Sequence, residues 1–463
     1  MSVVVIIVIL VALGASAAAS LHAILYKRDV RAAIGWTGFI WIAPFFGPLF
    51  YLLFGVNRIQ RRAKALRRRS RASNRSRAKA VSGRSIPLAR VGDRVLGTSM
   101  TKGNRITVHP DGAEVFELML QRIVEARHSI SLTMYIFERD ATGRRFIEAL
   151  SEAATRGVEV RVLIDAVGSR SAAAEIISDF EPGQAKAAQF LPARIPGIRT
   201  INLRNHRKAL VVDGREAFTG GMNIASGYAM HPAGSPIRDT QFAIEGPLVR
   251  DLQESFALDW LFTTGESLEG DTWFPSLEPR GSAAARLVAD GPDESFELSR
   301  WVILGAIAAA QRSIRIVTPY FVPDQSLIMA LNVASLRGVA VEIVIPEVLD
   351  HRVVKWASNA LLWQVLEKGC RIWFTPPPFD HSKLFTVDGL WTFFGSSNWD
   401  SRSLRLNFEL NVEAFDSGLA RRVERLILDR QTAGREVTLA DMDARSIPVR
   451  LRDGIARLFS PYL

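Results

Sequence analysis

Two long apolar runs open the chain. Residues 3–26 carry no Asp, Glu, Lys or Arg, and residues 32–56 form a second uncharged run rich in Phe and Trp. Each run is long enough to cross the hydrocarbon core of a bilayer as a helix. Only residues 27–31 separate them, so the pattern predicts a two-helix membrane anchor, a transmembrane hairpin, over residues 1–57. Pro44 and Pro48 predict a kink or a partly re-entrant path in the second run.

A cleaved signal peptide is the alternative for the first run. Residues 15–20 (Ala-Ser-Ala-Ala-Ala-Ser) resemble a small-residue cleavage site. The positively charged segment that should precede such a peptide is missing, and a second apolar run follows at once. The anchor is therefore the favoured interpretation.

A basic block follows the apolar runs. Residues 58–79 contain eleven Lys or Arg and no acid, which equals the whole formal net charge of +11. Positive charge beside an apolar span marks the cytoplasmic side and attracts anionic lipid. We therefore expect a basic juxtamembrane linker over residues 58–104 and a catalytic body in the cytoplasm, on a bacterial-type inner membrane crossed more than once. The rest of the chain is formally neutral, which argues against a nucleic-acid partner.

The remaining sequence repeats its own pattern. Helical periodicity, an alternating strand, a second helical run ending in Arg-Gly-Val and a β-branched strand occur in the same order twice. In the first half the predicted helix and strand are residues 113–125 and 126–135, and a second helical run ends in Arg-Gly-Val at 156–158 before a strand at 158–164. In the second half the corresponding ranges are 296–311, 310–320, 337–339 and 339–345. This order predicts an α/β protein of two pseudo-symmetric halves, residues 105–275 and 276–463. The lone Cys370 excludes an internal disulfide and cysteine-based metal sites, and we expect it to be buried.

A duplicated polar motif lies late in each half. Residues 206–213 and 381–388 both read His-x-Lys-x4-Asp, and each continues without a gap to a glycine and an asparagine. The two windows, from His206 to Asn223 and from His381 to Asn398, are identical at eight positions. A set of polar residues repeated at fixed spacing predicts two half-sites facing one shared pocket.

The residue types indicate phosphodiester chemistry. A protonated lysine cannot bind a metal ion, so Lys208 and Lys383 argue against a metal site. The two lysines, with Asn223 and Asn398, can hold phosphoryl oxygens and stabilise charge in the transition state. One of His206 and His381 can attack phosphorus while the other moves the proton of the leaving and incoming alcohols, without a cofactor. Asp213 and Asp388 lie at an odd offset from the lysines, so we expect them to brace the motif rather than to take protons.

The motifs resemble those of the phospholipase D superfamily, and more closely those of its bacterial cardiolipin synthases. The likeness covers nearly the whole chain, including the N-terminal hairpin and residues 54–58, 205–208, 217–224, 238–240, 319–324, 395–403 and 407–411. The resemblance implies mixed sheets flanked by helices and one active site formed by both halves. It also implies phosphatidyl transfer between two phosphatidylglycerol molecules, or other anionic phospholipids, through a phosphohistidine.

The resemblance also suggests residue roles. It implies that His206 is the nucleophile and His381 the general acid and base, with acidic residues downstream that orient each ring. We expect Asp239 to serve His206 and Glu409 to serve His381. Gln241 departs from the family, which usually has histidine after Arg-Asp-Thr, so the acceptor alcohol is less defined than the donor.

Three other functions compete with phosphatidyl transfer. The same pocket could pass the phosphatidyl group to water, as a hydrolytic phospholipase D does, or to another alcohol. A nuclease is disfavoured by the neutral body and the apolar anchor. A lipid-binding membrane protein without catalysis is disfavoured by the completeness of both motifs. The sequence leaves the oligomeric state and acyl preference open.

Overall fold

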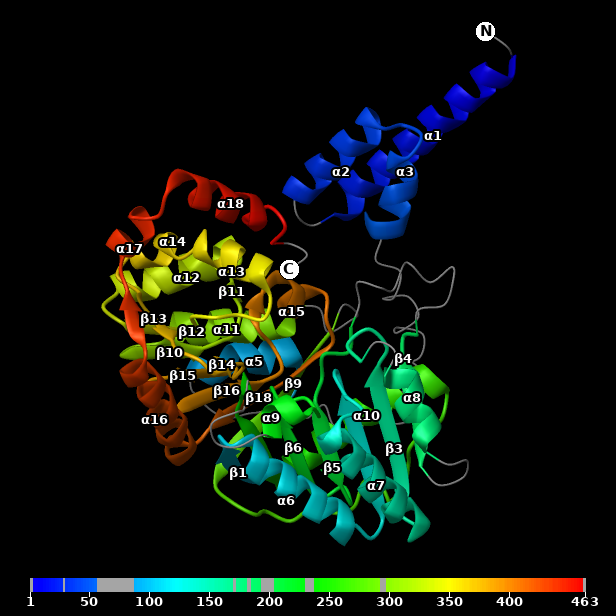
Figure 1. Cartoon of the computed structure of the whole chain (residues 1–463), viewed down its shortest axis with the longest axis vertical. Helices are drawn as coiled ribbons and strands as arrows, with labels where there is room; N and C mark the ends of the chain where they lie inside the picture. Colours follow the sequence, from blue (N-terminus) through cyan, green and yellow to red (C-terminus); the bar gives the residue numbers. More distant parts are fainter. Residues whose placement is uncertain are drawn as a thin grey trace. The chain divides into compact units, whose positions relative to one another are not determined.

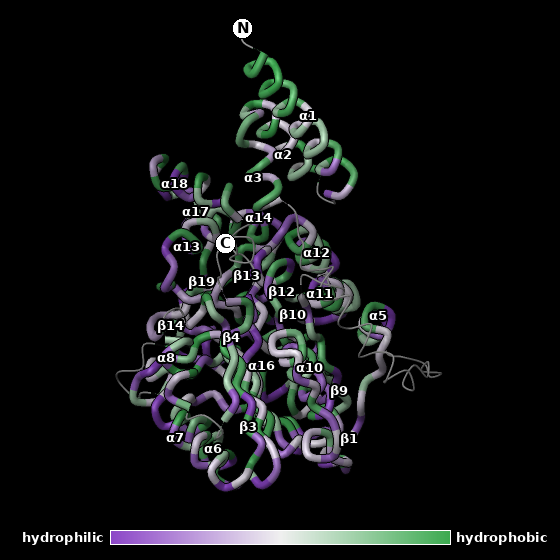
Figure 2. Tube along the Cα trace, turned by 90° about the vertical axis from the view of Figure 1, so that its right-hand side faces the viewer, coloured by the Kyte–Doolittle hydropathy of each residue, from purple (hydrophilic) through white to green (hydrophobic). Residues whose placement is uncertain are grey.

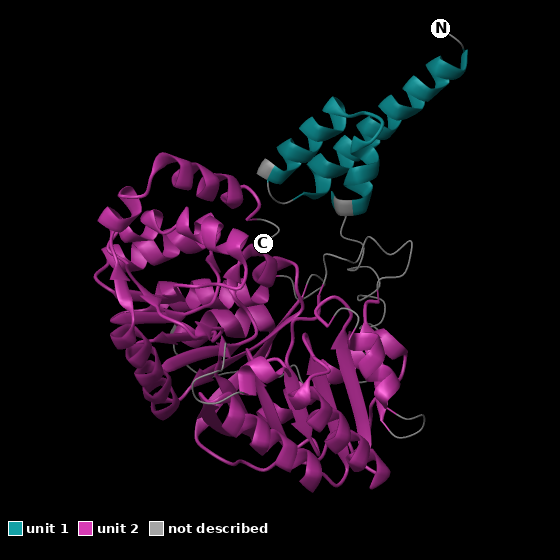
Figure 3. Ribbon diagram, in the orientation of Figure 1, with its two compact units in different colours: residues 1–65, 193–202 teal, residues 66–192, 203–463 magenta. Residues whose placement is uncertain are grey.

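The computed structural model describes residues 3–27, 30–55, 87–169, 172–180, 185–192, 204–229, 237–291 and 297–460. These residues form two compact units, one containing residues 3–55 and one containing residues 87–460 (Figure 3). The basic block at 58–79 lies outside the described residues.

The first unit is helical. Helix α1 (Val3–Tyr26) is hydrophobic along almost its whole length (Figure 2) and is the one helix of the described chain that is long and apolar enough to cross a membrane. The second apolar run is broken into α2 (Val30–Ile42), α3 (Gly47–Phe50) and a π-helical turn, η1 (Tyr51–Gly55). Ser16 Oγ donates to the carbonyl of Pro44 at 3.3 Å, so the run folds back along α1.

The kink predicted from Pro44 and Pro48 is confirmed, but a hairpin of two full spans is not. Helix α2 ends two residues before Pro44, whose ring cannot continue a helical hydrogen-bond pattern. The break leaves α2 shorter than the bilayer core requires. Only one candidate span therefore remains among the described residues.

The second unit is built on one sheet of fifteen strands. Strands β1 (Thr101–His109) and β9 (Ala283–Asp290) pair antiparallel at its centre. On the β1 side follow β8 (Gln241–Glu245), β6 (Glu216–Gly220), β5 (Ala209–Val212), β2 (Ser129–Met134), β3 (Glu159–Asp165) and β4 (Lys186–Phe190). On the β9 side follow β18 (Glu409–Phe415), β16 (Trp391–Gly395), β15 (Leu384–Val387), β10 (Ser313–Val317), β12 (Ala340–Pro346), β13 (Arg371–Thr375) and β19 (Arg435–Val437).

The two sides repeat each other except at one edge. The trios β2–β3–β4 and β10–β12–β13 are parallel, and the strands between each trio and the centre pair antiparallel. The second side ends in an extra strand, β19, which pairs antiparallel with β13. The predicted α/β architecture of two mixed-sheet halves is therefore confirmed, and the halves share one continuous sheet.

Helices flank the sheet in the predicted order (Figure 1). The first half carries α6 (Gly112–Glu125), α7 (Ala141–Thr155), α8 (Ala172–Asp179), α9 (Ser226–Ala229) and α10 (Leu248–Thr264). The second carries α11 (Leu298–Ala309), α12 (Gln325–Leu336), α13 (Arg352–Asn359), α14 (Trp363–Leu366), α15 (Ser401–Arg405), α16 (Ser417–Ala433), α17 (Leu439–Asp443) and α18 (Ile447–Arg457). Gly157 and Gly338, after α7 and α12, have φ of 93° and 90°, the left-handed conformation that ends a helix.

The folded body begins earlier than predicted. Residues 87–104, assigned to the linker from sequence, contain α5 (Pro87–Leu96) and the start of β1. Arg286 Nη1 contacts Asp93 at 2.5 Å and Arg286 Nη2 donates to the carbonyl of Ala89 at 2.9 Å. This buried arginine fixes α5 against the central strand β9, a tertiary contact that local composition does not reveal.

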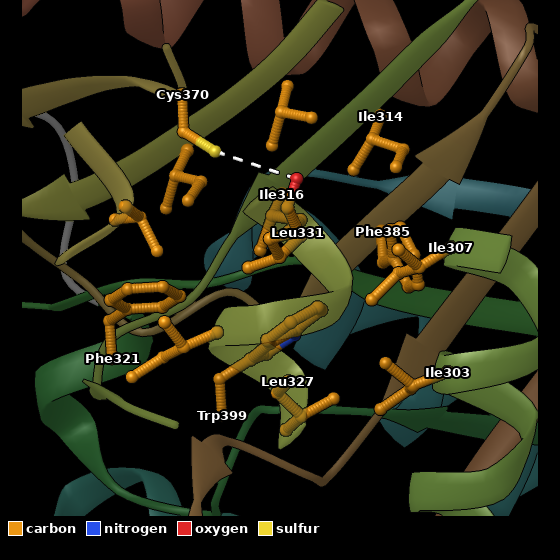
Figure 4. Packing of buried hydrophobic residues seen from close by; sticks show 14 of the residues in the cluster. Ile303, Ile307, Ile314, Ile316, Phe321, Leu327, Leu331, Cys370, Phe385 and Trp399 are labelled. Carbon is orange, nitrogen blue, oxygen red and sulfur yellow. Dashed lines mark hydrogen bonds between the residues drawn. The ribbon is translucent and has the colours of Figure 1, made fainter. Parts of the chain in front are cut away.

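Cys370 lies in the core of the second half. It belongs to a buried cluster of aliphatic and aromatic side chains that includes Ile316 and Leu331, and its Sγ lies 3.8 Å from the carbonyl oxygen of Leu331 (Figure 4). Burial raises the pKa of the Cys370 thiol to about 12. The predicted burial of Cys370 is confirmed.

Candidate active site

Each motif reaches the site by pairing with the opposite half. The amide of His206 donates to the carbonyl of Phe408 at 2.9 Å, and Asn205 forms a parallel β-bridge with Phe408. In the same way His381 donates to the carbonyl of Arg238 at 2.7 Å, where β14 (Phe379–Asp380) pairs with β7 (Ile237–Arg238). Both histidines therefore precede β5 and β15 and lie where the two halves meet.

The histidine–acid pairs cross between the halves. His206 Nδ1 lies 2.9 Å from Glu409 Oε2, and His381 Nδ1 lies 2.8 Å from Asp239 Oδ2. The predicted assignment of Asp239 to His206 and Glu409 to His381 is wrong. Asp239 directly follows the segment that pairs with the second motif, and Glu409 directly follows the residue that pairs with the first. The histidine that an acid orients therefore cannot be identified from the order of residues within one half. With Nδ1 occupied, Nε2 of each ring is the atom left for chemistry.

The two lysines lie beside the rings. Lys208 Nζ donates to the carbonyl of His206 at 2.7 Å, and Lys383 Nζ donates to the carbonyl of His381 at 2.5 Å and lies 3.0 Å from its Nε2. Both are buried. Burial lowers the pKa of Lys383 to about 8, although the negative charges of Asp239 and Glu409 act to raise it. Burial also lowers the pKa of Lys208 well below its ordinary value. An anion bound beside the lysines, such as a phosphodiester, would raise their pKa and favour the charged form.

Burial also sets the protonation of the two pairs. It lowers the pKa of both histidines well below the usual value, and the charges of Lys208 and Lys383 lower it further. Burial raises the pKa of Asp239 and of Glu409 to about 7, with Lys383 and Lys208 respectively opposing the rise. The two acids therefore titrate near neutral pH, the range that acid–base catalysis uses.

Asp213 and Asp388 face away from the histidines. Asp213 accepts hydrogen bonds from the amides of residues 127–129, and Asp388 accepts from those of residues 311–313, at 2.7–3.2 Å. Both have positive φ, 50° and 56°, at a tight turn. The predicted bracing geometry is confirmed, and in the described structure neither carboxylate bonds to His206 or His381.

The two asparagines differ in their partners. Asn223 accepts from the amide of Ile136 at 3.1 Å and donates to Tyr228 Oη at 2.9 Å, so its amide holds neighbouring elements. The side-chain oxygen of Asn398 is buried without a hydrogen-bond partner among the described residues. The same holds for the side-chain oxygen of Gln241, at the start of β8. Buried polar atoms of this kind are available to a ligand.

Three tyrosines at the site were not singled out from the sequence. The Tyr135 ring lies 4.7 Å from the His206 ring, and the Tyr320 ring lies 6.3 Å from the His381 ring. Tyr228 Oη lies 3.4 Å from His381 Nδ1. Tyr135 and Tyr320 follow β2 and β10, the strands that the two halves repeat, so the duplicated pattern could have identified them as a related pair.

Comparison with known proteins agrees with this geometry. Residues 119–260 and 303–430 match a family described as cardiolipin synthase, PLD-like domain, and residues 3–55 match the phospholipase D–nuclease N-terminal family. A cardiolipin synthase of Geobacillus thermodenitrificans is 32% identical over 95% of this chain and 90% of its own. One from Staphylococcus aureus is 33% identical over 79% of this chain and 74% of its own.

A solved structure shares the fold. The phosphatidylserine synthase of Haemophilus influenzae matches 82% of this chain and all of its own with a TM-score of 0.65, at 16% identity. At that identity the match speaks for the fold alone. The sequence matches are closer, and they span both halves and the N-terminal helices. The chain belongs to the cardiolipin synthase family of phospholipase D-like proteins.

Proposed function

We propose that this protein is a phosphatidyltransferase that joins two phosphatidylglycerol molecules into cardiolipin and releases glycerol. One observation carries the proposal beyond family membership. Two buried histidines are each held at Nδ1 by an acid of the opposite half, and a buried lysine donates to the backbone carbonyl of each histidine. This arrangement suits a double displacement at a phosphodiester.

The first step breaks the bond to glycerol. Nε2 of His206 attacks phosphorus, and the protonated Nε2 of His381 gives its proton to the departing glycerol oxygen. A phosphatidyl–His206 intermediate remains. Lys208, Lys383 and Asn398 hold the phosphoryl oxygens, while Asn223, Asp213 and Asp388 position the surrounding segments.

The second step forms cardiolipin. The head-group hydroxyl of a second phosphatidylglycerol gives its proton to His381 and attacks phosphorus, which breaks the bond to His206. Both histidines return to their starting protonation. Each proton taken is given back, and the scheme needs no metal or other cofactor.

We further propose that the body lies on the cytoplasmic face of the membrane. Residues 58–79 carry eleven Lys or Arg and no acid. If α1 alone spans, the basic residues 27, 28 and 31 lie on that same side. If the second run also spans, eleven basic residues still outweigh these three. Either path favours a cytoplasmic body next to anionic lipid.

The product assay separates the candidate activities. Full-length protein in detergent is given phosphatidylglycerol labelled in one acyl chain, and the products are resolved by chromatography. We expect cardiolipin with equimolar glycerol. Phosphatidic acid in place of cardiolipin would support the hydrolase, no turnover would support a binding protein, and cleavage of nucleic acid without lipid turnover would support a nuclease.

Covalent capture separates the roles of the two histidines. Acid quenching during turnover should leave labelled phosphatidyl groups on the wild-type protein and none on His206→Ala. His381→Asn should form the intermediate slowly and fail to release it. The reverse pattern would exchange the two roles.

A further inference from the structure

Exposed apolar side chains are distributed unequally between the two halves. Among the described residues from 87 to 460, the first half exposes one large hydrophobic residue, Val124, whereas the second half exposes fifteen. Part of the difference comes from α17 and α18, which have no counterpart after α10, so equivalent helices give the sharper comparison. A large exposed apolar surface indicates an interaction site.

Equivalent helices show the difference position by position. Helices α7 and α12 both end at Arg-Gly-Val, which aligns Glu148, Glu152 and Thr155 with Met329, Val333 and Leu336. All six side chains are exposed. The outer face of α7 is thus polar, and the same face of α12 is an apolar stripe with helical spacing.

The C-terminal helix carries a second stripe. Ile447, Leu451, Ile455 and Leu458 lie on one face of α18 and its end, and each is more than half exposed. The opposite face is buried through Asp453 and Ala456. Three arginines of α18 are exposed, Arg450, Arg452 and Arg457, whereas its one acid, Asp453, is already paired with Arg445 and Arg452.

Both helices lie on one side of the second half. Figure 1 and Figure 2 show α12, α13, α14 and α18 on the same side of its strands. Helix α18 packs on α13, where the Arg452 guanidinium lies 4.6 Å from the centre of the Trp356 ring.

This side is connected to the active site. Asp350, two residues before α13, accepts a hydrogen bond from Tyr320 Oη at 2.7 Å. The Tyr320 ring in turn lies 6.3 Å from the ring of His381. Two contacts therefore link the apolar side to a catalytic histidine.

We propose that the exposed faces of α12 and α18 form a docking surface that inserts into the head-group region of a bilayer containing anionic phospholipid. The inference deepens the proposed function, because it supplies the route by which a bilayer lipid reaches the pocket. An apolar stripe flanked by arginines is the pattern of an interfacial helix. A second copy of the chain would bring the exposed arginines of two α18 helices together, whereas anionic lipid complements them.

Site-specific labels test the surface directly. Full-length protein carrying Leu451→Cys or Val333→Cys is labelled with an environment-sensitive fluorophore and reconstituted into phosphatidylglycerol–phosphatidylcholine vesicles. Glu152→Cys on α7 is the matched control, and the thiol of Cys370 is buried and stays unlabelled. We expect lipids with a quencher at a shallow acyl position to quench the labels at 451 and 333 but not the label at 152. Equal quenching at all three positions, or none, overturns the proposal.

Dimerisation of the protein through this surface would give a different result. It would shield the labels at 451 and 333 in detergent as well, without quenching by lipid, and would give a dimer by light scattering. Quenching needs no turnover, so docking and the proposed reaction can fail separately.

Activity provides the second readout. Val333→Glu with Leu451→Glu should lower cardiolipin formation from vesicles about tenfold, which corresponds to the loss of one well-buried apolar contact. Turnover of short-chain phosphatidylglycerol below its micelle concentration should stay unchanged. A loss with both substrates, or with neither, contradicts a docking role.

Discussion

At the scale of single residues, the two histidines are equivalent in sequence but not in surroundings. Two positions before the motif histidine, the first half has Arg204 and the second half has Phe379. Tyr135 Oη accepts a hydrogen bond from Arg204 at 2.8 Å, whereas Tyr320 Oη donates to Asp350. After burial and the two lysines, the charges of Arg204 and Arg402 lower the pKa of His206 further. A neutral ring beside extra cations favours His206 as the nucleophile that meets the phosphate.

The crossed pairs predict the effect of removing one carboxylate. Glu409→Gln keeps the shape of the side chain but removes the charge that stabilises the His206 ring when it carries positive charge. We expect kcat to fall about 10²- to 10⁴-fold, by analogy with the loss of the aspartate from a serine–histidine–aspartate triad. Covalent capture should fall in parallel, because Glu409 acts on the attacking ring.

Asp239→Asn is the matched control for Glu409→Gln. It acts on His381, so the intermediate should still form, although slowly, and its release should be slowed as well. If instead Asp239→Asn abolished capture and Glu409→Gln spared it, either the crossed pairing or the role of His206 would be wrong.

The same carboxylates predict the pH dependence. Both have a pKa raised to about 7 by burial. Below that pH each takes up a proton and loses the charge that orients its histidine, so kcat/KM should fall as pH drops through about 7. Two groups titrating together should give a limiting slope near two in a logarithmic plot, and Glu409→Gln should reduce it to about one. An unchanged slope in the variant would exclude Glu409 as the titrating group.

The bracing aspartates should act on stability rather than on chemistry. Asp213→Ala leaves three backbone amides without their acceptor, so we expect a loss of about 1–3 kcal/mol in the free energy of unfolding. The folded fraction should keep most of its kcat. Urea unfolding and turnover of the same preparation measure both, and a collapse of kcat without loss of stability would assign Asp213 to the reaction.

At the scale of elements, each motif is tied to the long helix that follows β8 in the first half and β18 in the second, but with the charges exchanged. Arg207 of the first motif pairs with Asp259 of α10 at 2.5 Å. In the second half Arg430 of α16 pairs with Asp380 at 2.5 Å and donates to Ser382 Oγ at 3.1 Å. Both pairs are buried. Each motif therefore supplies one member of a buried cation–carboxylate pair and the helix supplies the other, with the signs exchanged between the halves.

The buried pair of Arg430 and Asp380 gives a stability prediction. Burial favours the neutral form of Asp380, but Arg430 and the hydrogen bonds of Ser382 outweigh it and hold the pKa of Asp380 below its ordinary value. Arg430→Met leaves that carboxylate buried and uncompensated, which should cost about 3–5 kcal/mol in the free energy of unfolding. The double variant Arg430→Met with Asp380→Asn should recover part of the loss. Additive losses in urea unfolding would show that the two groups act independently.

Sequence periodicity predicted the elements well because each helix and strand has a local signature. The sequence alone predicted the repeated order of elements, the helix ends at Gly157 and Gly338 and the bracing role of Asp213. The crossed pairing of Glu409 with His206 was not, because it depends on which strand lies next to which motif. Helix α5 was missed for a related reason, since Arg286 holds it from a strand almost two hundred residues away.

At the scale of the whole second unit, β1 and β9 join the halves into one sheet. Each half also supplies the acid that orients the other's histidine, so neither half contains a complete histidine–acid pair. On its other side β9 pairs with β18 over seven residues from Glu409 to Phe415, so the strand that joins the halves also supports the strand that begins with Glu409. Folding and catalysis therefore depend on the same junction.

This dependence can be tested by dividing the chain. A cut in the exposed turn-rich segment near Gly270, between α10 and β9, leaves every strand intact. Neither fragment alone should form cardiolipin or capture a phosphatidyl group, because His206 lacks Glu409 in one and His381 lacks Asp239 in the other. Co-expressed fragments should pair through β1 and β9 and recover activity. Co-expression with a second fragment carrying Glu409→Gln should fail to recover it, which separates restored chemistry from mere association; covalent capture by the first fragment alone would show that His206 works without the second half.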